Sequence, residues 1–424
     1  MTVRSSCHAL FRSFGSGLLI QAILSASNFF VGSMLIRRTS DVQYGYYVLV
    51  FTTILLLTAL QGSFIQPQMV VRMVRLDGAG RADLIGGLLR EQRVLLRFVA
   101  AGIMITVVML WLARLLDTGQ SLLIVCATLA AAATLMREYF RMVLFACRRP
   151  QDVLRADACY VALLLGGVLL ATYSSIAAIF ATLTMAFAAG ASTMLLSKAA
   201  SKSRPWNPQG AHGILRAFAP LGAWSLAGAG AHWALSQSYS FVAAGVLSLQ
   251  SVAAIAATRL LLMPLNLVSA GLNTQLFPLT ADWVHRLGVL AALRRLALVS
   301  VGLVGLALCY FALVWLLRDW IFTELLHKQF PQRDALLLLW SGAFVLMLVR
   351  DQLVKLLAAC ERFPVLASVT AVSAVLSLAF GYGAMLRFGE VGAVAGIAIG
   401  ELANIVGIVI LTVRELKRAV PAPA

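Results

Sequence analysis

Two arginines lie deep inside long apolar segments of this 424-residue chain. Arg259 and Arg350 stand well away from the ends of runs that are long enough to cross a membrane. Because an arginine in hydrocarbon costs several kcal/mol, it normally faces a polar cavity or a partner. Its planar guanidinium keeps its proton and binds phosphate through two parallel hydrogen bonds, so we expect an anion-binding cavity, with pyrophosphate as one candidate. Arg137 and Arg141, beside Glu138, lie nearer a segment end and either reach the headgroups or line a cavity.

Other polar residues share the apolar segments. Gln21, Ser25 and Asn28 recur at helical spacing on one face of the first segment. Such side chains either join helices by hydrogen bonds or line a path for a polar substrate. Asp351 and Lys355 form an i, i+4 pair, which is either a structural ion pair or a functional one.

No enzymatic motif is present in the sequence. The chain has no G-x-x-x-x-G-K-[ST] phosphate loop, no H-E-x-x-H pair and no C-x-x-C spacing among its six cysteines. The longest segments between apolar runs hold about 20 residues, too few for a separate catalytic domain. We therefore predict a protein that is not an enzyme, with no catalytic residues, no metal and no cofactor.

The composition indicates which elements hold these residues. Hydrophobic residues make up 61% of the chain and charged residues 12%, with a mean hydropathy of +0.90, whereas a soluble domain carries about 25% charged residues. A membrane-crossing helix needs about 20 apolar residues. The expected spans are 14–36, 46–69, 94–115, 121–146, 158–173, 176–196, 217–240, 247–276, 293–317, 335–360, 364–386 and 391–413. The fifth is short, and its helix is expected to begin earlier, near Val153. We predict an all-α polytopic membrane protein with about 12 transmembrane helices.

Basic residues indicate the orientation. The chain carries 34 Lys and Arg against 17 Asp and Glu, a net charge of +17. With the N-terminus inside, most basic residues fall in inside segments, which follows the positive-inside rule and predicts that both termini are cytoplasmic. The anionic inner leaflet explains the basic excess better than nucleic acid does. A polar segment with prolines, 201–216, is the predicted cytoplasmic linker between two six-helix lobes, 1–200 and 217–424.

Two short patches resemble polysaccharide flippases. The first helix runs into Arg37-Arg38-Thr39-Ser40-Asp41-Val42-Gln43-Tyr44-Gly45-Tyr46-Tyr47, similar to the basic, acidic, Tyr-Gly-x-Tyr pattern that opens the second helix in that family. The stretch Arg259-Leu260-Leu261-Leu262-Met263-Pro264 resembles the family's eighth-helix pattern, although residues 245–249 lack the tyrosine common there. The chain thus resembles the Wzx-type O-antigen transporters of the multidrug/oligosaccharidyl-lipid/polysaccharide superfamily.

The resemblance implies a flippase that moves undecaprenyl-pyrophosphate-linked oligosaccharide across the bacterial cytoplasmic (inner) membrane by alternating access. The exported product would be a surface polysaccharide such as O-antigen, capsule or exopolysaccharide. Arg259, Arg350 and Arg141 would then bind pyrophosphate, and Asp351 and Glu401 are candidates for ion coupling. Residues expected along the sugar path are Gln21, Asn28, Gln61, Asn266 and Asn273. The expected partners are the lipid-linked oligosaccharide, membrane lipids and, by pathway, a polysaccharide polymerase with its chain-length machinery, and no nucleic acid.

Three other interpretations stay open. A multidrug or cation antiporter of the same superfamily tends to carry an acid in its first helix, and none lies between Phe14 and Ile36. The major facilitator class carries Asp-Arg and Gly-Arg elements after its second helix, which residues 75–81 match only in part. A membrane-embedded polymerase or ligase of the glycan pathway usually has one large external loop, whereas the longest external loop expected here, 317–334, is short.

Cysteine labelling tests the loop assignment. In a background with the six native cysteines replaced by alanine, single cysteines are introduced into each predicted loop. An impermeant maleimide applied to intact cells should label only the short external loops, because the basic loops stay inside. A large, protease-resistant external domain would instead favour the polymerase or ligase.

Overall fold

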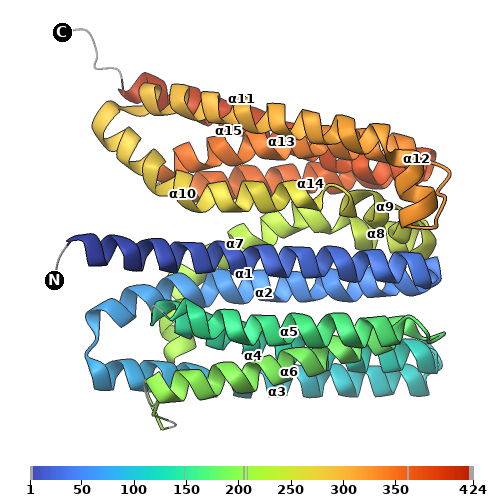
Figure 1. Ribbon diagram of the computed structural model, residues 1–424, viewed down its shortest axis with the longest axis horizontal. Coiled ribbons are helices and arrows are strands. Elements are labelled where there is room, and N and C mark those ends of the chain that lie inside the picture. Colours follow the sequence, from blue (N-terminus) through green and yellow to red (C-terminus); the bar gives the residue numbers. More distant parts are fainter. Residues whose placement is uncertain (1–2, 148, 204–205, 208, 361, 420–424) are drawn as a thin grey trace. The chain divides into compact units, whose positions relative to one another are not determined.

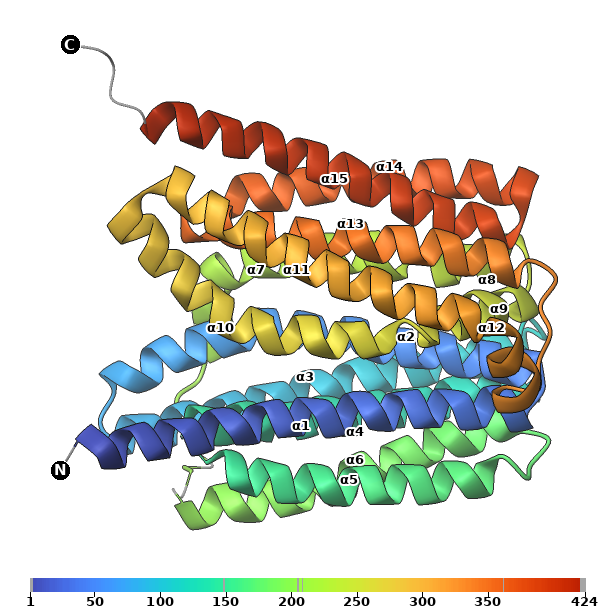
Figure 2. The same ribbon diagram turned by 45° about the horizontal axis from the view of Figure 1, so that its top comes forward.

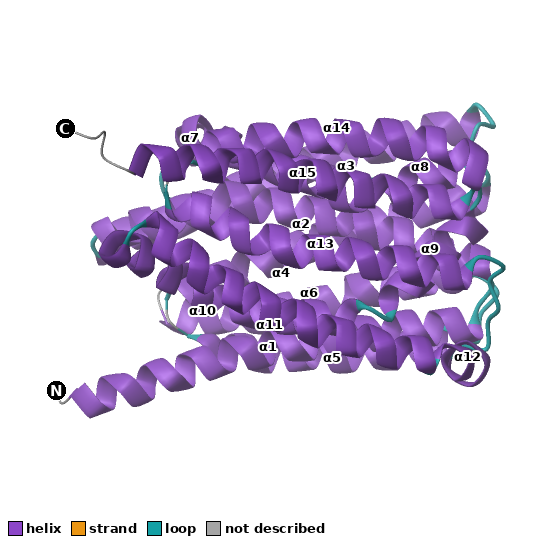
Figure 3. Cartoon of the chain, turned by 90° about the horizontal axis from the view of Figure 1, so that it is seen from above, coloured by secondary structure: helices purple, strands orange, loops and turns teal. Residues whose placement is uncertain are grey.

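The computed structural model describes residues 3–147, 149–203, 206–207, 209–360 and 362–419. Helices joined by short loops make up nearly all of this described chain, and it contains no strand (Figure 3). The chain divides into two compact units, Met1–Ala229 and Gly230–Ala424. This division falls inside one helix, α7 (Ile214–Gln237), which begins within the last residues of the segment 201–216.

The first unit is a bundle of long helices that lie side by side (Figures 1 and 2). They are α1 (Val3–Arg38), α2 (Asp41–Arg75), α3 (Gly78–Leu112), α4 (Thr118–Ala146), α5 (Pro150–Ala171), α6 (Ala177–Ser203) and the first part of α7. Its core is apolar and includes the fully buried side chains of Met69, Leu88, Tyr139 and Phe218. In α4, the ring of Tyr139 packs edge-on against Phe140.

Local sequence signals set where these helices begin. The side chains of Ser40 and Asp77 accept hydrogen bonds from backbone N–H groups in the first turns of α2 and α3. Asp117 forms a reciprocal capping box with Gln120 at the start of α4. Pro150 occupies the first turn of α5, where its missing N–H is not needed. Each cap satisfies N–H groups that a helix start leaves unpaired.

The second unit is also entirely helical within its described residues. Its helices are the end of α7, α8 (Tyr239–Val246), α9 (Leu249–Leu260), α10 (Met263–Leu287), α11 (Val289–Leu316), α12 (Arg318–Trp320), the π-helical turn η1 (Ile321–Leu325), α13 (Arg333–Ala359), α14 (Phe363–Phe388) and α15 (Glu390–Ala419). Helix α13 packs against α11 and α15, and α15 packs along α14. Because α13 has α11 and α15 as neighbours, many of its residues lie inside the unit.

The eighth expected span, 247–276, is not one helix. The chain breaks between α9 and α10 at Leu261 and Leu262, just before Pro264. Proline lacks an N–H and its ring clashes with the preceding turn, so it favours a kink or a break, and here Pro264 lies in the first turn of the new helix α10. Helix α11 satisfies a carbonyl freed at the break, because the Tyr310 hydroxyl donates to the Leu261 oxygen at 2.6 Å.

Ten helices of the described chain are long and apolar enough to cross a membrane. The other two expected spans, 217–240 and 247–276, correspond to α7 and to the broken α9–α10 segment. In α7, glycine, serine and histidine residues lower the mean hydropathy. The ten apolar helices make the chain a multi-pass integral membrane protein of all-α class, as the sequence predicts.

Small residues allow α14 and α15 to pack closely. Gly392, Gly396 and Gly400 recur every fourth residue on one face of α15, a spacing that brings membrane helices into backbone contact. A Cβ atom at Gly396 would meet the Ser377 oxygen at 2.9 Å and would also collide with the Gly381 backbone. The glycine face thus fixes how near Glu401, the residue after Gly400, lies to the rest of the unit.

Replacing Gly396 by alanine should therefore force α14 and α15 apart. We expect Gly396→Ala to lower the stability of the purified protein by about 1–3 kcal/mol, in the range of overpacked cores. Gly383→Ala in α14 is the matched control because no atom lies within 4 Å of its added Cβ. Thermal unfolding in detergent measures both, and equal melting temperatures would contradict the close packing.

Candidate functional site

A cluster of buried charges lies inside the first unit. Arg137 on α4 donates to Asp157 on α5 at 2.6 Å (Nη2 to Oδ1), and Asp157 is fully buried. Arg141, one turn along α4, lies 3.1 Å from the other Asp157 oxygen and 2.6 Å from Glu138. The Arg137 guanidinium also lies 3.9 Å from the centre of the Tyr160 ring. Two arginines and two carboxylates thus balance one another within the helices, as burial of charge requires.

A second buried cluster lies inside the other unit. The Arg350 Nη1 atom on α13 lies 2.6 Å and 2.7 Å from the two carboxylate oxygens of Glu401 on α15. Its Nη2 atom lies 2.9 Å from Asp351. Glu401 is fully buried and Arg350 is 5% exposed. One arginine therefore bonds both candidate ion-coupling residues, Asp351 and Glu401, in this conformation.

The two clusters have the same arrangement of residues. In each unit an arginine followed at once by an acid lies in the second half of a long helix: Arg137-Glu138 in α4 and Arg350-Asp351 in α13. In each, the arginine also bonds a fully buried acid from another helix of the same unit, Asp157 or Glu401. Each of these four carboxylates thus bonds an arginine. Because Arg350 alone serves both Asp351 and Glu401, the second positive charge of that cluster comes from Lys355, one turn from Asp351 on α13.

Arg259 has a different environment. It lies in the last turn of α9, next to the helix break. Its Nη1 atom donates to Gln237 at 2.6 Å and to the Tyr239 hydroxyl at 3.0 Å, and its guanidinium lies 5.2 Å from the centre of the Trp340 ring. Its Nε atom is buried with no hydrogen-bond partner.

No carboxylate among the described residues pairs with Arg259, so its charge is uncompensated there. Aromatic faces and an amide oxygen stabilise a guanidinium only in part. Arginine at a helix C-terminus also interacts favourably with the helix dipole. In membrane transporters, substrate sites are typically formed where helices are discontinuous. Arg259 is accordingly the residue best placed to attract an anion.

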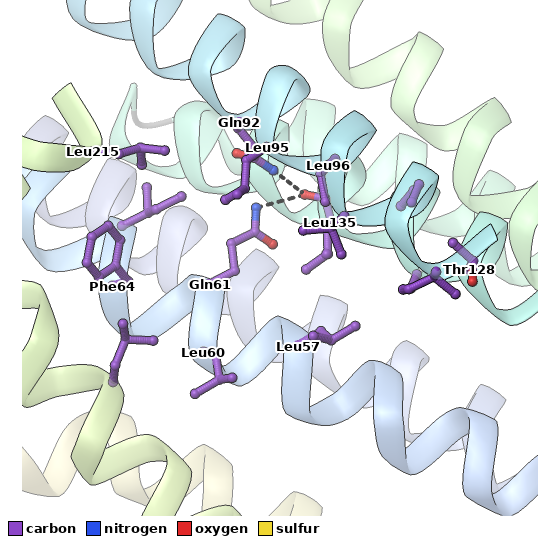
Figure 4. Close-up of a pocket in the computed structure, with 17 residues that line it drawn as sticks. Leu57, Leu60, Gln61, Phe64, Gln92, Leu95, Leu96, Thr128, Leu135 and Leu215 are labelled. Atoms are coloured by element: carbon purple, nitrogen blue, oxygen red, sulfur yellow. Dashed lines mark hydrogen bonds between the residues drawn. The ribbon is translucent and has the colours of Figure 1, made fainter. Parts of the chain in front are cut away.

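Gln61 lies at the wall of a cavity in the first unit. The cavity has a volume of about 420 Å³ and lies between α2, α3, α4 and the start of α7. The Gln61 and Gln92 amides both donate to the Leu135 carbonyl oxygen, at 2.9 Å and 3.3 Å (Figure 4). The other lining residues are apolar apart from Thr128. This cavity suits an apolar molecule better than a sugar.

The remaining expected sugar-path residues lie on α1 and α10. Gln21 is exposed on α1, and Asn28 is half-buried on the same helix. Asn266 and Asn273 belong to α10, but their side chains lie outside the described part of the structure. The structure therefore brings Arg350, Asp351 and Glu401 together and places Arg141 in the other unit's cluster.

Sequence reasoning missed Asp157, the fully buried partner of Arg137. The apolar run of the fifth span begins at residue 158; the helix expected to begin near Val153 contains Asp157, but this acid was not selected as a site residue. Helix α5 begins at Pro150, and Asp157 lies two turns inside. An acid at that position in an apolar helix needs a basic partner, which is the signal that could have found it.

Comparisons with known proteins show the fold. No protein-family model matches the sequence, and no curated protein matches it. An inward-facing multidrug resistance MATE family transporter of the MOP superfamily matches with a TM-score of 0.73 and 14% identity, over 94% of this chain and 96% of that one. An outward-facing MATE transporter matches with a TM-score of 0.62 and 14% identity, over 96% of each chain. The lipid II flippase MurJ, inward closed, matches with a TM-score of 0.67 and 11% identity, over 95% of this chain and 89% of that one.

This chain has the fold of the MATE transporters and of the lipid II flippase MurJ. MOP in the description of the MATE transporter abbreviates the multidrug/oligosaccharidyl-lipid/polysaccharide superfamily that the sequence patches resemble. The matched structures include drug transporters and a lipid flippase, so the fold alone selects neither substrate. The choice depends on the charges inside the helices.

The Arg350–Glu401 bond predicts non-additive mutational effects. Glu401→Leu or Arg350→Met alone should destabilise the protein by about 3–5 kcal/mol, because each leaves a buried charge without its main partner. Arg350→Met combined with Glu401→Leu should cost less than the two single losses added together. Arg286→Ala, which breaks an exposed pair with Asp282, is the control and should cost at most about 1 kcal/mol.

Thermal unfolding of the four variants in one detergent measures these differences. Additive losses from the two single substitutions would contradict direct pairing of Arg350 with Glu401.

Proposed function

We propose that the protein is a flippase that moves undecaprenyl-pyrophosphate-linked oligosaccharide across the bacterial inner membrane by alternating access. The observation that carries the proposal is Arg259, a cation inside the membrane that no described carboxylate neutralises. Arginine binds phosphate through a planar pair of N–H donors. Its Nε has no hydrogen-bond partner and it lies at a helix break, so it can donate hydrogen bonds to such a ligand.

The buried acids favour an anionic substrate over a cationic one. A cation needs a carboxylate without a counter-charge, yet Glu138, Asp157, Asp351 and Glu401 each bond an arginine. Replacing an arginine by a cationic drug would break a charged hydrogen bond inside a low-dielectric region. The charge balance of the described spans therefore suits a phosphate-bearing lipid.

In this proposal Arg350 and Arg141 bind pyrophosphate only after an existing ion pair is broken. Both are bonded to acids in the conformation described, so either would bind pyrophosphate only if the phosphate replaced a carboxylate. The same exchange would free Asp351 or Glu401 to take a coupling ion. Gln21, Asn28, Asn266 and Asn273 are proposed to contact sugar hydroxyls along the path, whereas Gln61 lies at the wall of the apolar cavity and is not assigned to the path. A polymerase that consumes the flipped unit, with its chain-length machinery, would act after this step.

A multidrug antiporter is the second candidate function. The apolar cavity of about 420 Å³ in the first unit falls in the size range of drug sites. MATE transporters with multidrug resistance function share the fold. This candidate predicts that cells without the protein become sensitive to lipophilic cations.

Complementation of a deletion strain tests the flippase. Without the protein, lipid-linked glycan should accumulate on the inner leaflet, and Arg259→Gln should behave the same, with about tenfold to hundredfold less surface glycan, as expected for loss of charged hydrogen bonds. Arg259→Lys keeps the positive charge but lacks the planar pair of N–H donors, so it should give an intermediate level of surface glycan. Arg387→Gln removes an exposed charge in the same unit and should have no effect.

Immunoblots of membranes verify insertion of each variant. Normal surface glycan with Arg259→Gln would overturn the phosphate role. Unchanged glycan in the deletion strain, together with ethidium sensitivity, would support the antiporter instead.

A further inference from the structure

A basic hollow lies on the first unit, away from both buried charge clusters. It has a volume of about 240 Å³ and is lined by Gly86, Leu89, Arg90, Arg93, Val94, Arg97 and Trp206. Three of these residues are arginines from successive turns of α3. Arg93 and Arg97 are exposed and pair with no carboxylate among the described residues. The proposed flippase activity uses none of them.

The hollow is held open by residues that follow α6. The Asn207 N–H donates to the Ala82 oxygen at 3.1 Å, and its side-chain amide donates to Asp83 at 2.7 Å. The backbone of Asn207 passes so close to Gly86 that any Cβ there would collide with its carbonyl oxygen. Trp206 then packs against Phe140, with ring centres 5.6 Å apart. Trp206 is therefore fixed as one wall of the hollow.

Two more contacts keep this segment on α3. Arg90 donates to the Ala211 oxygen at 3.0 Å. Glu91 accepts from the backbone N–H groups of Ile214 and Leu215, at 3.0 Å and 2.8 Å, and so caps the start of α7. Because Arg90 and Glu91 are both engaged, Arg93 and Arg97 provide the charge available to a ligand.

The surroundings indicate where the ligand lies. Beyond the hollow, α3 exposes large apolar side chains that do not line the apolar cavity, among them Met104, Ile105 and Val108, with 37%, 65% and 48% of their surface accessible. Such side chains on a membrane helix face lipid tails. Arg93 and Arg97 lie where this apolar surface begins, on the side that the arginine distribution predicts to be cytoplasmic. Tryptophan is likewise enriched at this depth of a bilayer.

We propose that this hollow binds the phosphate headgroup of an anionic phospholipid from the cytoplasmic leaflet. The arginine forks bond the phosphoryl oxygens, and the acyl chains lie along the apolar side chains of α3. A neutral, zwitterionic lipid gains less from two uncompensated cations, so the site discriminates by net charge. The volume fits a headgroup and leaves the tails outside.

Lipid binding to the purified full-length protein tests this site without reference to transport. Native mass spectrometry follows retention of phosphatidylglycerol and phosphatidylcholine. We expect Arg93→Gln with Arg97→Gln to weaken phosphatidylglycerol binding about 30-fold, from the usual contribution of two interfacial arginines. Phosphatidylcholine binding should stay the same.

Two further variants distinguish binding in the hollow from attraction of the lipid by the net charge of the protein. Arg155→Gln with Arg294→Gln removes equal charge from exposed positions elsewhere and should leave phosphatidylglycerol binding within about twofold, as expected for isolated surface charges. Gly86→Ala keeps every charge but displaces Asn207 and Trp206, and it should also weaken binding. A melting curve for each variant confirms that it is folded.

The proposal is overturned if the Arg155/Arg294 variant loses as much binding as the Arg93/Arg97 variant. It is also overturned if phosphatidylcholine binds wild-type protein as tightly as phosphatidylglycerol.

Competition by inorganic pyrophosphate shows whether the hollow binds the phosphate of a lipid or a soluble phosphate. Weak competition by millimolar pyrophosphate supports a lipid ligand, whereas complete displacement of the lipid would assign the site to a soluble phosphate and contradict the lipid proposal.

Discussion

The cost of placing charge in hydrocarbon is the constraint on which this structure depends. Glu138, Asp157, Asp351 and Glu401 lie inside the described spans, and each bonds an arginine of its own unit. Separate carboxylates at this depth would each cost several kcal/mol, so the pairs are needed simply for the helices to assemble. One consequence is that these acids are already occupied. A substrate that needs an acid must compete with the arginine already bonded to it.

Arg259 departs from this pattern, and the fold shows how its position is maintained. The chain breaks after α9, Tyr310 satisfies the freed carbonyl of Leu261, and Trp340 donates to the Ile255 oxygen at 3.3 Å. Tyr239 packs edge-on against Trp340 and also accepts from Arg259. These contacts hold a guanidinium at a helix break without neutralising it. A site of this kind suits an anion that arrives and leaves during transport.

Apolar runs were sufficient to predict the all-α membrane class, since a bilayer admits few alternatives to helices. They were insufficient where a helix is interrupted or begins with polar residues. The run 247–276 predicts one span where the chain forms α9 and α10, and the run from 158 did not mark Asp157, which lies just before it in α5, as a buried partner of arginine. The Arg350–Glu401 bond joins residues that are 51 positions apart, so only tertiary structure reveals it. Sequence spacing selected Arg259 and Arg350 as equals, and the structure distinguishes them by their partners.

We propose that the uncompensated cation at the helix break selects an anionic lipid. Binding of a polyprenyl pyrophosphate and of tetraphenylphosphonium to the purified protein in nanodiscs, measured for the wild type and for Arg259→Gln, tests this selection. We expect saturable binding of the pyrophosphate lipid that weakens at least about tenfold in the variant, as loss of a charged hydrogen bond implies, and no saturable binding of the cation. Saturable cation binding, with pyrophosphate binding unaffected by the substitution, would contradict it.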